Sequence, residues 1–409
     1  MKRKYSILSM IVAVSGLFAG CNDAEYGIKD NSIYLVEAAS TAKSAMAPMM
    51  PAGADITVTV RLAKPVAENT EVNIGLSPEE LEKYNSENGS FYLCIPLEHT
   101  NLGANAKVTV KAGEVAVSKE IHINYFDMQG KRYALPIAIN GLSGNVETSA
   151  SQSKFIYIVD KKLFVRTPNI KYRISDGPAI EAQPLEVTDP SGNKSGGWNL
   201  SLSSYTLEFW ARLDKYNSQN FAIFGIYGNN SAIPDNYEFY LRFGDANSKP
   251  NPENGSRNYI NWKAWGAQLT GPFELIAQQW NHWAAVYDGT NVILYRNGEE
   301  YLKSSAKYPG SNWIMHTVIL ITSHTSTNNT MNLSQIRLWK KALSSTQIKS
   351  NMYYEADPSH PDLEAYWKMD EGPDNFRNIF HDATGHGHDA IFYPNRVYDF
   401  SWTEPQNFE

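Results

Sequence analysis

The segment Trp280–Gly298 constrains the fold more than any other part of the chain. Its sequence, WNHWAAVYDGTNVILYRNG, is typical of a β-hairpin. An apolar strand ends at Tyr287 and meets Asp288-Gly289-Thr290-Asn291, where residues that tolerate positive φ let the chain reverse. A second strand starts at Val292, and Asn297-Gly298 predicts another reversal. We therefore expect this part of the chain to form an antiparallel sheet.

The length, composition and net charge of the chain indicate at least two globular domains and no nucleic-acid partner. A chain of 409 residues exceeds one ordinary core, and its 19% charged and 42% hydrophobic residues are typical of globular proteins. The net charge is -7, and no basic run follows the first four residues, so binding through phosphate contacts is not expected. All 10 Trp lie at or after Trp198, which indicates a Trp-free domain followed by a Trp-rich one.

The first 31 residues predict export and a lipid anchor. Basic residues 2–4 precede an apolar run over residues 7–19, which predicts a signal peptide over residues 1–20. The sequence LFAGC at residues 17–21 resembles the cleavage box of bacterial lipoproteins, which implies that Cys21 is lipidated and that residues 21–31 form a tether. We therefore expect an outer-membrane protein exposed at the cell surface that touches the membrane only through its lipid. Ordinary secretion, with Cys21 near a free terminus, is the alternative.

Residues 32–165 predict an immunoglobulin-like sandwich. Apolar and polar residues alternate over residues 56–62, and the same period of two recurs at residues 72–76, 108–110 and 121–123, while Ser77-Pro78 indicates the start of a short helix. Residues 81–85, 95–97, 108–113 and 133–139 resemble domain-of-unknown-function family 1735. That family occurs on secreted bacterial lipoproteins of glycan-utilisation loci, including some family 18 endoglycosidases. The resemblance implies a module that accompanies glycan-handling domains and has no known catalytic residue.

Residues 166–409 predict a second all-β domain. The strand at residues 205–213 precedes the hairpin, and the run IRLWKKALSSTQI at residues 336–348 predicts a strand and then a helix whose capping box is Ser344 with Gln347. Together with residues 366–372 and 382–389, these segments resemble laminin-G-like domains of the concanavalin A-like lectin and glucanase fold. The resemblance implies a jelly-roll sandwich, so the predicted fold class is all-β: an immunoglobulin-like sandwich followed by a concanavalin A-like one.

The sequence does not predict an enzyme. A glycoside hydrolase needs two carboxyl groups that flank the glycosidic oxygen. The strand pattern E-x-D-x-x-E of family 16 glycosidases is absent, as is the family 18 pattern D-x-x-D-x-D-x-E. The nearest acid, Glu208, is followed by Trp210 and Arg212 at the alternating positions. An endo-acting glycoside hydrolase assembled from distant residues remains an alternative.

A group of aromatic and polar residues predicts a carbohydrate site. Sugar rings stack on flat, half-exposed aromatic rings, while their hydroxyls need amides and carboxylates. The residues predicted to bind carbohydrate are Tyr259, Trp262, Trp265, Asn261, Asp245 and Arg242. The alternative is that Trp262 and Trp265 fill the core, as large aromatic residues usually do.

Asp382 and Asp389, with carbonyls of the Gly-rich turn between them, are candidate ligands of Ca²⁺, which prefers oxygen ligands. The alternative is that Asp382 shapes a tight turn. His381, His386 and His388 indicate zinc only weakly, because the Gly-rich turn offers no scaffold that fixes ligand directions.

The function that these observations predict is glycan capture at the cell surface, without catalysis. The expected partners are a glycan ligand, an outer-membrane transporter and the glycosidases of the same locus, and the only expected cofactor is Ca²⁺. The alternatives are an endo-acting glycoside hydrolase and a protein-binding adhesion module.

Overall fold

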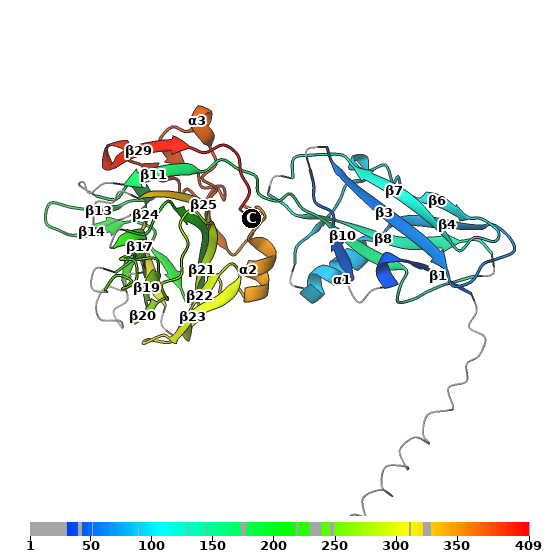
Figure 1. The fold of residues 1–409 in the computed structure, drawn as a ribbon, viewed down its shortest axis with the longest axis horizontal. Coiled ribbons are helices and arrows are strands. Elements are labelled where there is room, and N and C mark those ends of the chain that lie inside the picture. The colour runs from blue at the N-terminus through cyan, green and yellow to red at the C-terminus, as the bar shows by residue number, and fades with distance from the viewer. Residues whose placement is uncertain are drawn as a thin grey trace, which may run out of the picture. The chain divides into compact units, whose positions relative to one another are not determined.

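The computed structural model describes residues 31–408, apart from 40–42, 51, 89, 129, 145, 173–176, 218–219, 230–238, 246–248, 311 and 322–328. The predicted signal peptide and Cys21 lie outside the described residues. The chain divides into two compact units, an N-terminal unit made mainly of Ala52–Tyr125 and Ala134–Ile158, and a C-terminal unit that contains Val159–Glu409. Both are β-sandwiches, so the predicted fold class is confirmed (Figure 1). No helix among the described residues is long and apolar enough to span a membrane.

The N-terminal unit packs two sheets around one core. The first has the strand order β7 (Ala116–Ile123), β3 (Ala54–Leu62), β1 (Ser32–Leu35), β9 (Glu147–Thr148). The second has the order β2 (Ser44–Met46), β10 (Lys154–Val159), β8 (Tyr133–Leu142), β4 (Thr70–Leu76), β6 (Ala106–Val110), and β5 (Leu93–Cys94) pairs with β8. Every second residue of β3 and β6 is buried, as the alternation predicts. The predicted short helix is α1 (Pro78–Asn88).

One sheet of the C-terminal unit, which we call the hairpin sheet, contains the predicted hairpin of residues Trp280–Gly298. Its order is β23 (Glu299–Ser305), β22 (Asn291–Arg296), β21 (Asn281–Tyr287), β16 (Tyr205–Leu213), β25 (Thr330–Trp339), β11 (Pro168–Tyr172), β29 (Val397–Trp402), and β26 (Leu363–Trp367) pairs with β25. Asn297 and Gly298 have φ of 52° and 79°, as a two-residue hairpin turn between β22 and β23 requires. Asp288 accepts hydrogen bonds from the backbone of Thr290 and Asn291, which shapes the turn between β21 and β22. Both predicted reversals are confirmed.

The opposing sheet has the order β20 (Ala267–Thr270), β19 (Ile260–Ala264), β18 (Phe239–Phe243), β17 (Phe221–Asn229), β24 (Trp313–Ile321), β12 (Ile180–Ala182), β28 (Ala390–Phe392), β27 (Ile379–Phe380), and β15 (Leu200–Leu202) pairs with β24. β13 (Glu186–Thr188) and β14 (Lys194–Gly196) form a separate ribbon. The core between the two sheets is aromatic, and its largest fully buried side chains include Trp262, Trp283, Phe209 and Phe224.

The hairpin sheet is also covered on its outer side. Ala284 and Val286 of β21 pack there against Leu343 and against Ile348 of the helix α2 (Ser345–Asn351). The predicted capping box of α2 is present, with the Ser344 hydroxyl accepting from the backbone of Gln347 and the Gln347 side chain accepting from the backbone of Ser344. Every residue of β21 is buried as a result. Figure 1 shows α2 beside β21 and β22, while α3 (Gly372–Asn375) lies near β29.

Candidate functional site

The aromatic residues predicted to stack on sugar lie in the core. Tyr259, Trp262 and Trp265 are only 1%, 0% and 3% exposed, so the prediction that they are half-exposed is wrong. Trp262 shares the inward side of β19 with Ile260 and Ala264, because alternate residues of a strand point to the same side. Trp265 follows β19 with a φ of 50°, and its ring stacks on Tyr287 with 4.3 Å between the ring centroids. The alternative reading, in which both tryptophans fill the core, is the one that the structure supports.

The polar residues of the predicted site do come together. The Arg242 guanidinium donates from Nη2 to Asp245 Oδ2 at 2.5 Å and from Nε to Asn261 Oδ1 at 3.2 Å. A second donor, Gln268 Nε2, lies 3.3 Å from the same Asp245 oxygen. The guanidinium also lies over the ring of Tyr240, 5.0 Å from its centroid. We call Arg242, Asp245, Asn261 and Gln268 the polar cluster.

Strand pairing explains why these side chains meet. Arg242 of β18 pairs with Asn261 of β19, which in turn pairs with Thr270 of β20. The next row on the same side of the opposing sheet contains Tyr240, Lys263 and Gln268. These positions alternate with the core residues of the same strands, so they lie on the side of the sheet that faces away from the core.

The neighbouring strand β17 contributes only small residues on this side of the sheet. Ala222 pairs with Arg242, and Gly225 pairs with Tyr240. β17 therefore places no large side chain next to the guanidinium of Arg242 or the ring of Tyr240.

The backbone of Asp245 is held in place from two directions. Its N–H donates to the Tyr259 hydroxyl at 2.6 Å, and its carbonyl accepts from Arg257 Nη1 at 2.9 Å. Asn261 is fixed as well, because its amide donates to the Thr270 hydroxyl at 2.7 Å and to the Leu269 carbonyl at 3.2 Å. A site whose polar groups are positioned before a ligand arrives loses less conformational entropy on binding.

One aromatic residue beside this cluster, Phe273, was not among the predicted site residues. Phe273 is 41% exposed, and its ring packs edge-on against Tyr259 with 5.0 Å between centroids and an angle of 84°. Tyr259 thus connects an exposed ring to the backbone of Asp245 in the polar cluster. The available signal was Gly271-Pro272 directly after β20, because such a pair marks a turn that carries the next residue to the surface.

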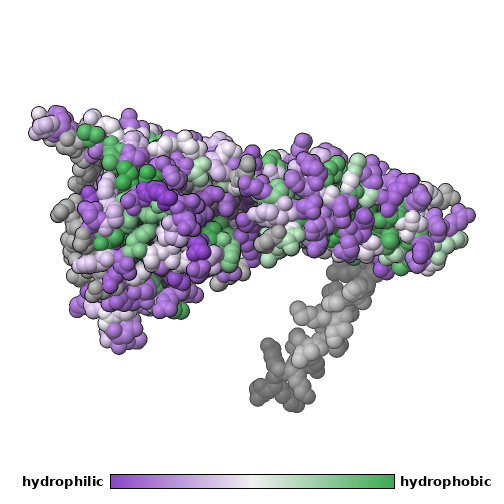
Figure 2. All heavy atoms as spheres, turned by 90° about the horizontal axis from the view of Figure 1, so that it is seen from above, coloured by the Kyte–Doolittle hydropathy of each residue, from purple (hydrophilic) through white to green (hydrophobic). Residues whose placement is uncertain are grey.

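Together these residues offer the two kinds of contact that a sugar needs. The exposed ring of Phe273 provides an apolar surface for the C–H face of a sugar ring. Within the polar cluster, Gln268 is exposed and Arg242 is partly exposed, so these two can meet sugar hydroxyls, whereas Asp245 (4% exposed) and Asn261 (0% exposed) lie beneath them and hold them in place. Lys263, Gln268 and Thr270 are exposed and surround the cluster. In the view of Figure 2, hydrophilic residues cover most of the surface, and smaller apolar areas lie between them.

Glu208, the acid nearest to a hydrolase pattern, does not line a cleft. Its side chain is fully buried, accepts from Arg337 Nη1 at 3.2 Å and from the Trp339 indole at 2.9 Å, and lies 3.5 Å from His282 Nε2. Burial lowers the pKa of His282 to about 4, although the Glu208 carboxylate opposes this shift. These residues form a buried network of the hairpin sheet that a substrate does not reach.

Glu371 of the C-terminal unit has a carboxyl group with a strongly raised pKa. Burial raises its pKa to about 7, and the nearby Asp370 adds to the effect. Its Oε1 accepts from the backbone of His381 at 2.9 Å, whereas Oε2 is buried and has no hydrogen-bond partner among the described residues. A raised pKa alone would suit a general acid, but this oxygen is inaccessible to a glycosidic bond.

The two candidate calcium ligands already accept other hydrogen bonds. Asp382 accepts from the backbone of Tyr366 at 3.0 Å, of Thr384 at 3.1 Å and of His388 at 3.3 Å. Asp389 accepts from the backbone of Asp382 at 2.8 Å. This geometry favours the alternative in which Asp382 shapes a turn. No group of three or more His, Cys, Asp or Glu in the described part of the chain is arranged to hold a metal, and Ca²⁺ binding stays a prediction.

The three histidines of this turn contact different partners. His381 Nδ1 lies 3.1 Å from Asp389 Oδ2, and His386 Nδ1 lies 2.9 Å from the Glu364 carbonyl. His388 stacks on Trp198 with 3.6 Å between ring centroids, and its Nε2 lies 3.1 Å from a carboxylate oxygen of Glu364. They are not brought together as zinc ligands.

Comparison with known families bears on the C-terminal unit. The family described as the concanavalin A-like lectin/glucanases superfamily, in its laminin G form, matches residues 189–349. The C-terminal unit is therefore similar to concanavalin A-like domains. Residues 29–146 match a second family, whose description is that of an N-terminal domain, and this match agrees with the predicted N-terminal module. No curated protein matches the chain.

Among solved structures, a Bacteroides ovatus protein to which carbohydrate binding is ascribed has 17% identity and a TM-score of 0.55, covering 92% of this chain and 100% of its own. It therefore shares the fold. Bacteroides thetaiotamicron EndoBT-3987, solved with a Man5GlcNAc product, has 20% identity and a TM-score of 0.26 over 32% of this chain and 30% of its own. A SAP-like pentraxin from Limulus polyphemus has 12% identity and a TM-score of 0.31 over 45% and 80%.

Proposed function

We propose that the protein binds carbohydrate through the side of the opposing sheet that carries the polar cluster. The observation that supports this proposal most is the exposed Phe273 ring, joined through Tyr259 to the fixed Asp245. The concanavalin A-like domain and the relative to which carbohydrate binding is ascribed support the same class of ligand. Over β21, the outer side of the hairpin sheet is covered by Leu343 and by Ile348 of α2.

In this proposal the protein captures its ligand without cleaving it. Glu208 and the Oε2 atom of Glu371 are buried, so neither carboxyl group is placed to act on a bound sugar. Capture would serve an outer-membrane transporter and the glycosidases of the same locus. The signal peptide, the lipidation pattern at Cys21 and the N-terminal family match support a lipid-anchored protein at the cell surface.

A glycan array with residues 22–409 tests the proposal. We expect a defined set of glycans to bind, and we expect Phe273→Ala to lower the affinity about tenfold or more, because one stacked ring is removed from the site. Tyr398→Ala is the matched control, since Tyr398 is another exposed aromatic residue of the same unit, on β29 of the hairpin sheet. Both variants should keep a Tm close to that of the wild type, because Phe273 and Tyr398 are 41% and 56% exposed.

Other outcomes separate the alternatives. An array without hits would contradict the proposal and favour the protein-binding adhesion module. Release of reducing ends from a bound glycan would show an endo-acting glycoside hydrolase instead. Repeating the array in EDTA tests the predicted Ca²⁺, since loss of binding that Ca²⁺ restores would show a metal-dependent site.

A further inference from the structure

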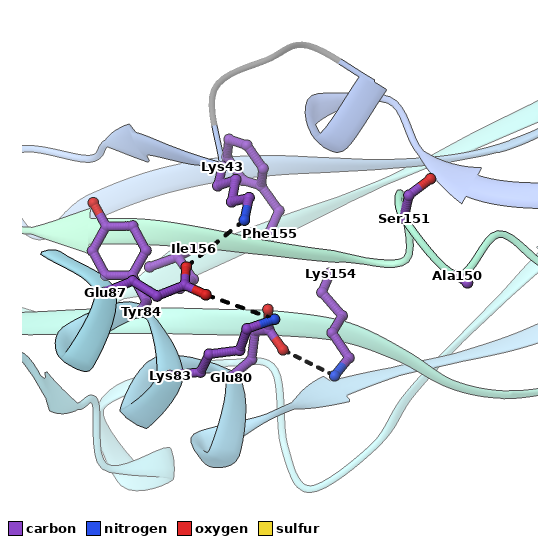
Figure 3. A pocket seen from close by; sticks show the side chains of 10 residues that line it. All are labelled: Lys43, Glu80, Lys83, Tyr84, Glu87, Ala150, Ser151, Lys154, Phe155 and Ile156. Carbon is purple, nitrogen blue, oxygen red and sulfur yellow. Dashed lines mark hydrogen bonds and ion pairs between the residues drawn. The ribbon is translucent and has the colours of Figure 1, made fainter.

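A pocket of about 310 Å³ lies in the N-terminal unit (Figure 3). Three separate segments form it: the helix α1, the start of β10 with the turn before it, and Lys43 just before β2. Residues distant in sequence thus meet around one cavity whose volume lies at the lower end of the range for small-ligand sites. The pocket belongs to a different unit from the polar cluster, and the proposed function does not use it.

The helix α1 lines the pocket with one of its sides. Glu80, Lys83, Tyr84 and Glu87 follow the spacing i, i+3, i+4, i+7, which brings side chains of a helix to the same side. In Figure 3, Glu87 points from α1 toward Lys43, and Glu80 points toward Lys154. The helix therefore contributes alternating charges along the pocket and one aromatic ring between them.

Three ammonium groups share two carboxylates in this pocket. Lys154 Nζ lies 3.0 Å from Glu80, whereas Lys83 and Lys43 lie 3.9 Å and 3.8 Å from the single carboxylate of Glu87. Among the residues that line the pocket, the lysines thus outnumber the carboxylates by one. Glu79, outside the lining, interacts with Lys154 and leaves Lys43 and Lys83 to share the carboxylate of Glu87. The two longer ion pairs are solvent-exposed, and such pairs exchange readily for other partners.

The floor of the pocket is apolar and fixed. Ile156 is 3% exposed and packs in a core cluster with Leu81, and Tyr84 packs against this cluster. The Tyr84 hydroxyl lies 3.0 Å from the Ser44 hydroxyl, which holds the ring in place. A ligand in this pocket would thus meet an apolar floor below and charged groups along the sides.

We propose that this pocket binds an acidic sugar, a pyranose that carries a carboxylate, such as a hexuronic acid. The ligand carboxylate takes the excess ammonium charge through charge-assisted hydrogen bonds from Lys83 and Lys43. Glu80, Glu87 and the Ser151 hydroxyl accept hydrogen bonds from the sugar hydroxyls. Inorganic phosphate fits less well, because it has no C–H face for the apolar floor and carries more negative charge than one carboxylate, so both glutamates repel it more strongly.

Isothermal titration of residues 22–409 with sodium glucuronate, glucose and inorganic phosphate tests this assignment. We expect glucuronate to bind at least tenfold more tightly than glucose or phosphate, and its affinity to fall with added salt. Lys83→Met should lower the glucuronate affinity roughly tenfold, the loss expected for a hydrogen bond to a charged group. Lys107→Met is the matched control, because Lys107 is an exposed lysine of β6, outside the pocket, that also pairs with a glutamate.

Three outcomes would overturn the proposal: no binding of glucuronate, equal binding of phosphate or glucose, or an equal loss in Lys83→Met and Lys107→Met. Phe273→Ala separates this pocket from the proposed site of the C-terminal unit. Glucuronate binding that survives in Phe273→Ala supports the pocket, whereas its loss would place glucuronate in the C-terminal unit and refute the assignment. Thermal unfolding of both lysine variants should match the wild type, because the replaced side chains are exposed.

Discussion

Replacing Trp262 tests the placement of the predicted sugar-binding aromatics most directly. The side chain is 0% exposed and packs against Phe239 with 5.5 Å between ring centroids. An aromatic side chain of this kind buries about 200 Å² at about 25 cal/mol per Å², so Trp262→Ala should lower the free energy of unfolding by about 5 kcal/mol. Measured Trp→Ala costs of about 3–5 kcal/mol agree with this value. For a unit of this size, the expected fall in Tm is about 6–20 °C.

A matched pair of milder variants isolates the indole N–H. Trp262 Nε1 is buried without a hydrogen-bond acceptor among the described residues, whereas Trp210 Nε1 donates to the Met352 carbonyl at 2.8 Å. Trp210→Phe leaves that carbonyl unsatisfied, which costs about 1–3 kcal/mol, and Trp262→Phe loses no hydrogen bond. We therefore expect Trp262→Phe to be the less destabilising variant of the two.

Thermal unfolding followed by near-UV circular dichroism measures these effects on residues 22–409. Glycan binding is measured at a temperature well below the Tm of each variant, where Trp262→Phe should bind like the wild type. A Trp262→Ala variant that keeps its Tm but loses glycan binding would refute the reasoning, because the ring would then lie at the surface and contact the ligand.

The remaining predictions concern the buried ionisable groups. His282 has a pKa of about 4 in the folded protein and about 6.5 when unfolded, so the unfolded state binds a proton first as the pH falls. The free energy of unfolding should therefore fall by about 3 kcal/mol between pH 6.5 and 4. His282→Asn should remove this pH dependence, which urea titrations at several pH values measure. Glu371 has the opposite sign. Its folded pKa of about 7 lies above the ordinary value of 4.5, so the free energy of unfolding falls as the pH rises from 4.5 to about 7 and stays lower above that. Glu371→Gln should therefore stabilise by up to about 3 kcal/mol at pH 8 and not at pH 4, and equal effects at both would contradict its burial. Asp382→Ala leaves three backbone N–H groups without an acceptor and should lower the free energy of unfolding by roughly 3 kcal/mol. If this variant loses more Tm relative to the wild type in Ca²⁺ than in EDTA, the ion binds at this turn.

Local patterns predicted the features of this fold that depend on neighbouring residues. The two turns of the hairpin and the capping box of α2 follow from residues a few positions apart, and the structure contains all three. Arg242 and Asn261 were both predicted as site residues, and the pairing of adjacent strands brings them together. Fold class was predictable for the same reason, because a period of two along many short segments indicates strands.

Exposure of the aromatic residues was not predicted correctly, for physical reasons. The binding prediction for Trp262 rested on the polar residues around it, whereas in the folded chain Trp262 shares the inward side of β19 with Ile260. Trp265 turns inward through a positive φ, which is uncommon for a bulky residue and has no sequence signature. Phe273 was not predicted as a site residue, because its contact with Tyr259 exists only in the folded chain.

The pocket of the N-terminal unit could not be predicted from the sequence. Its walls come from residues 43, 80–87 and 150–156, and their proximity follows from the pairing of β2 with β10 and from the packing of α1 beside them. None of these segments carries a motif of its own. Charge counts along the chain also conceal the local excess of lysine, because they average over both units.

The helix α2 has a consequence for any attempt to retarget this protein. Because α2 covers the outer side of the hairpin sheet over β21, every residue of β21 is buried. A substitution there would therefore lower the free energy of unfolding. Libraries for new ligands should therefore randomise Lys263, Gln268, Thr270 and Phe273, which already face water, and leave the hairpin untouched.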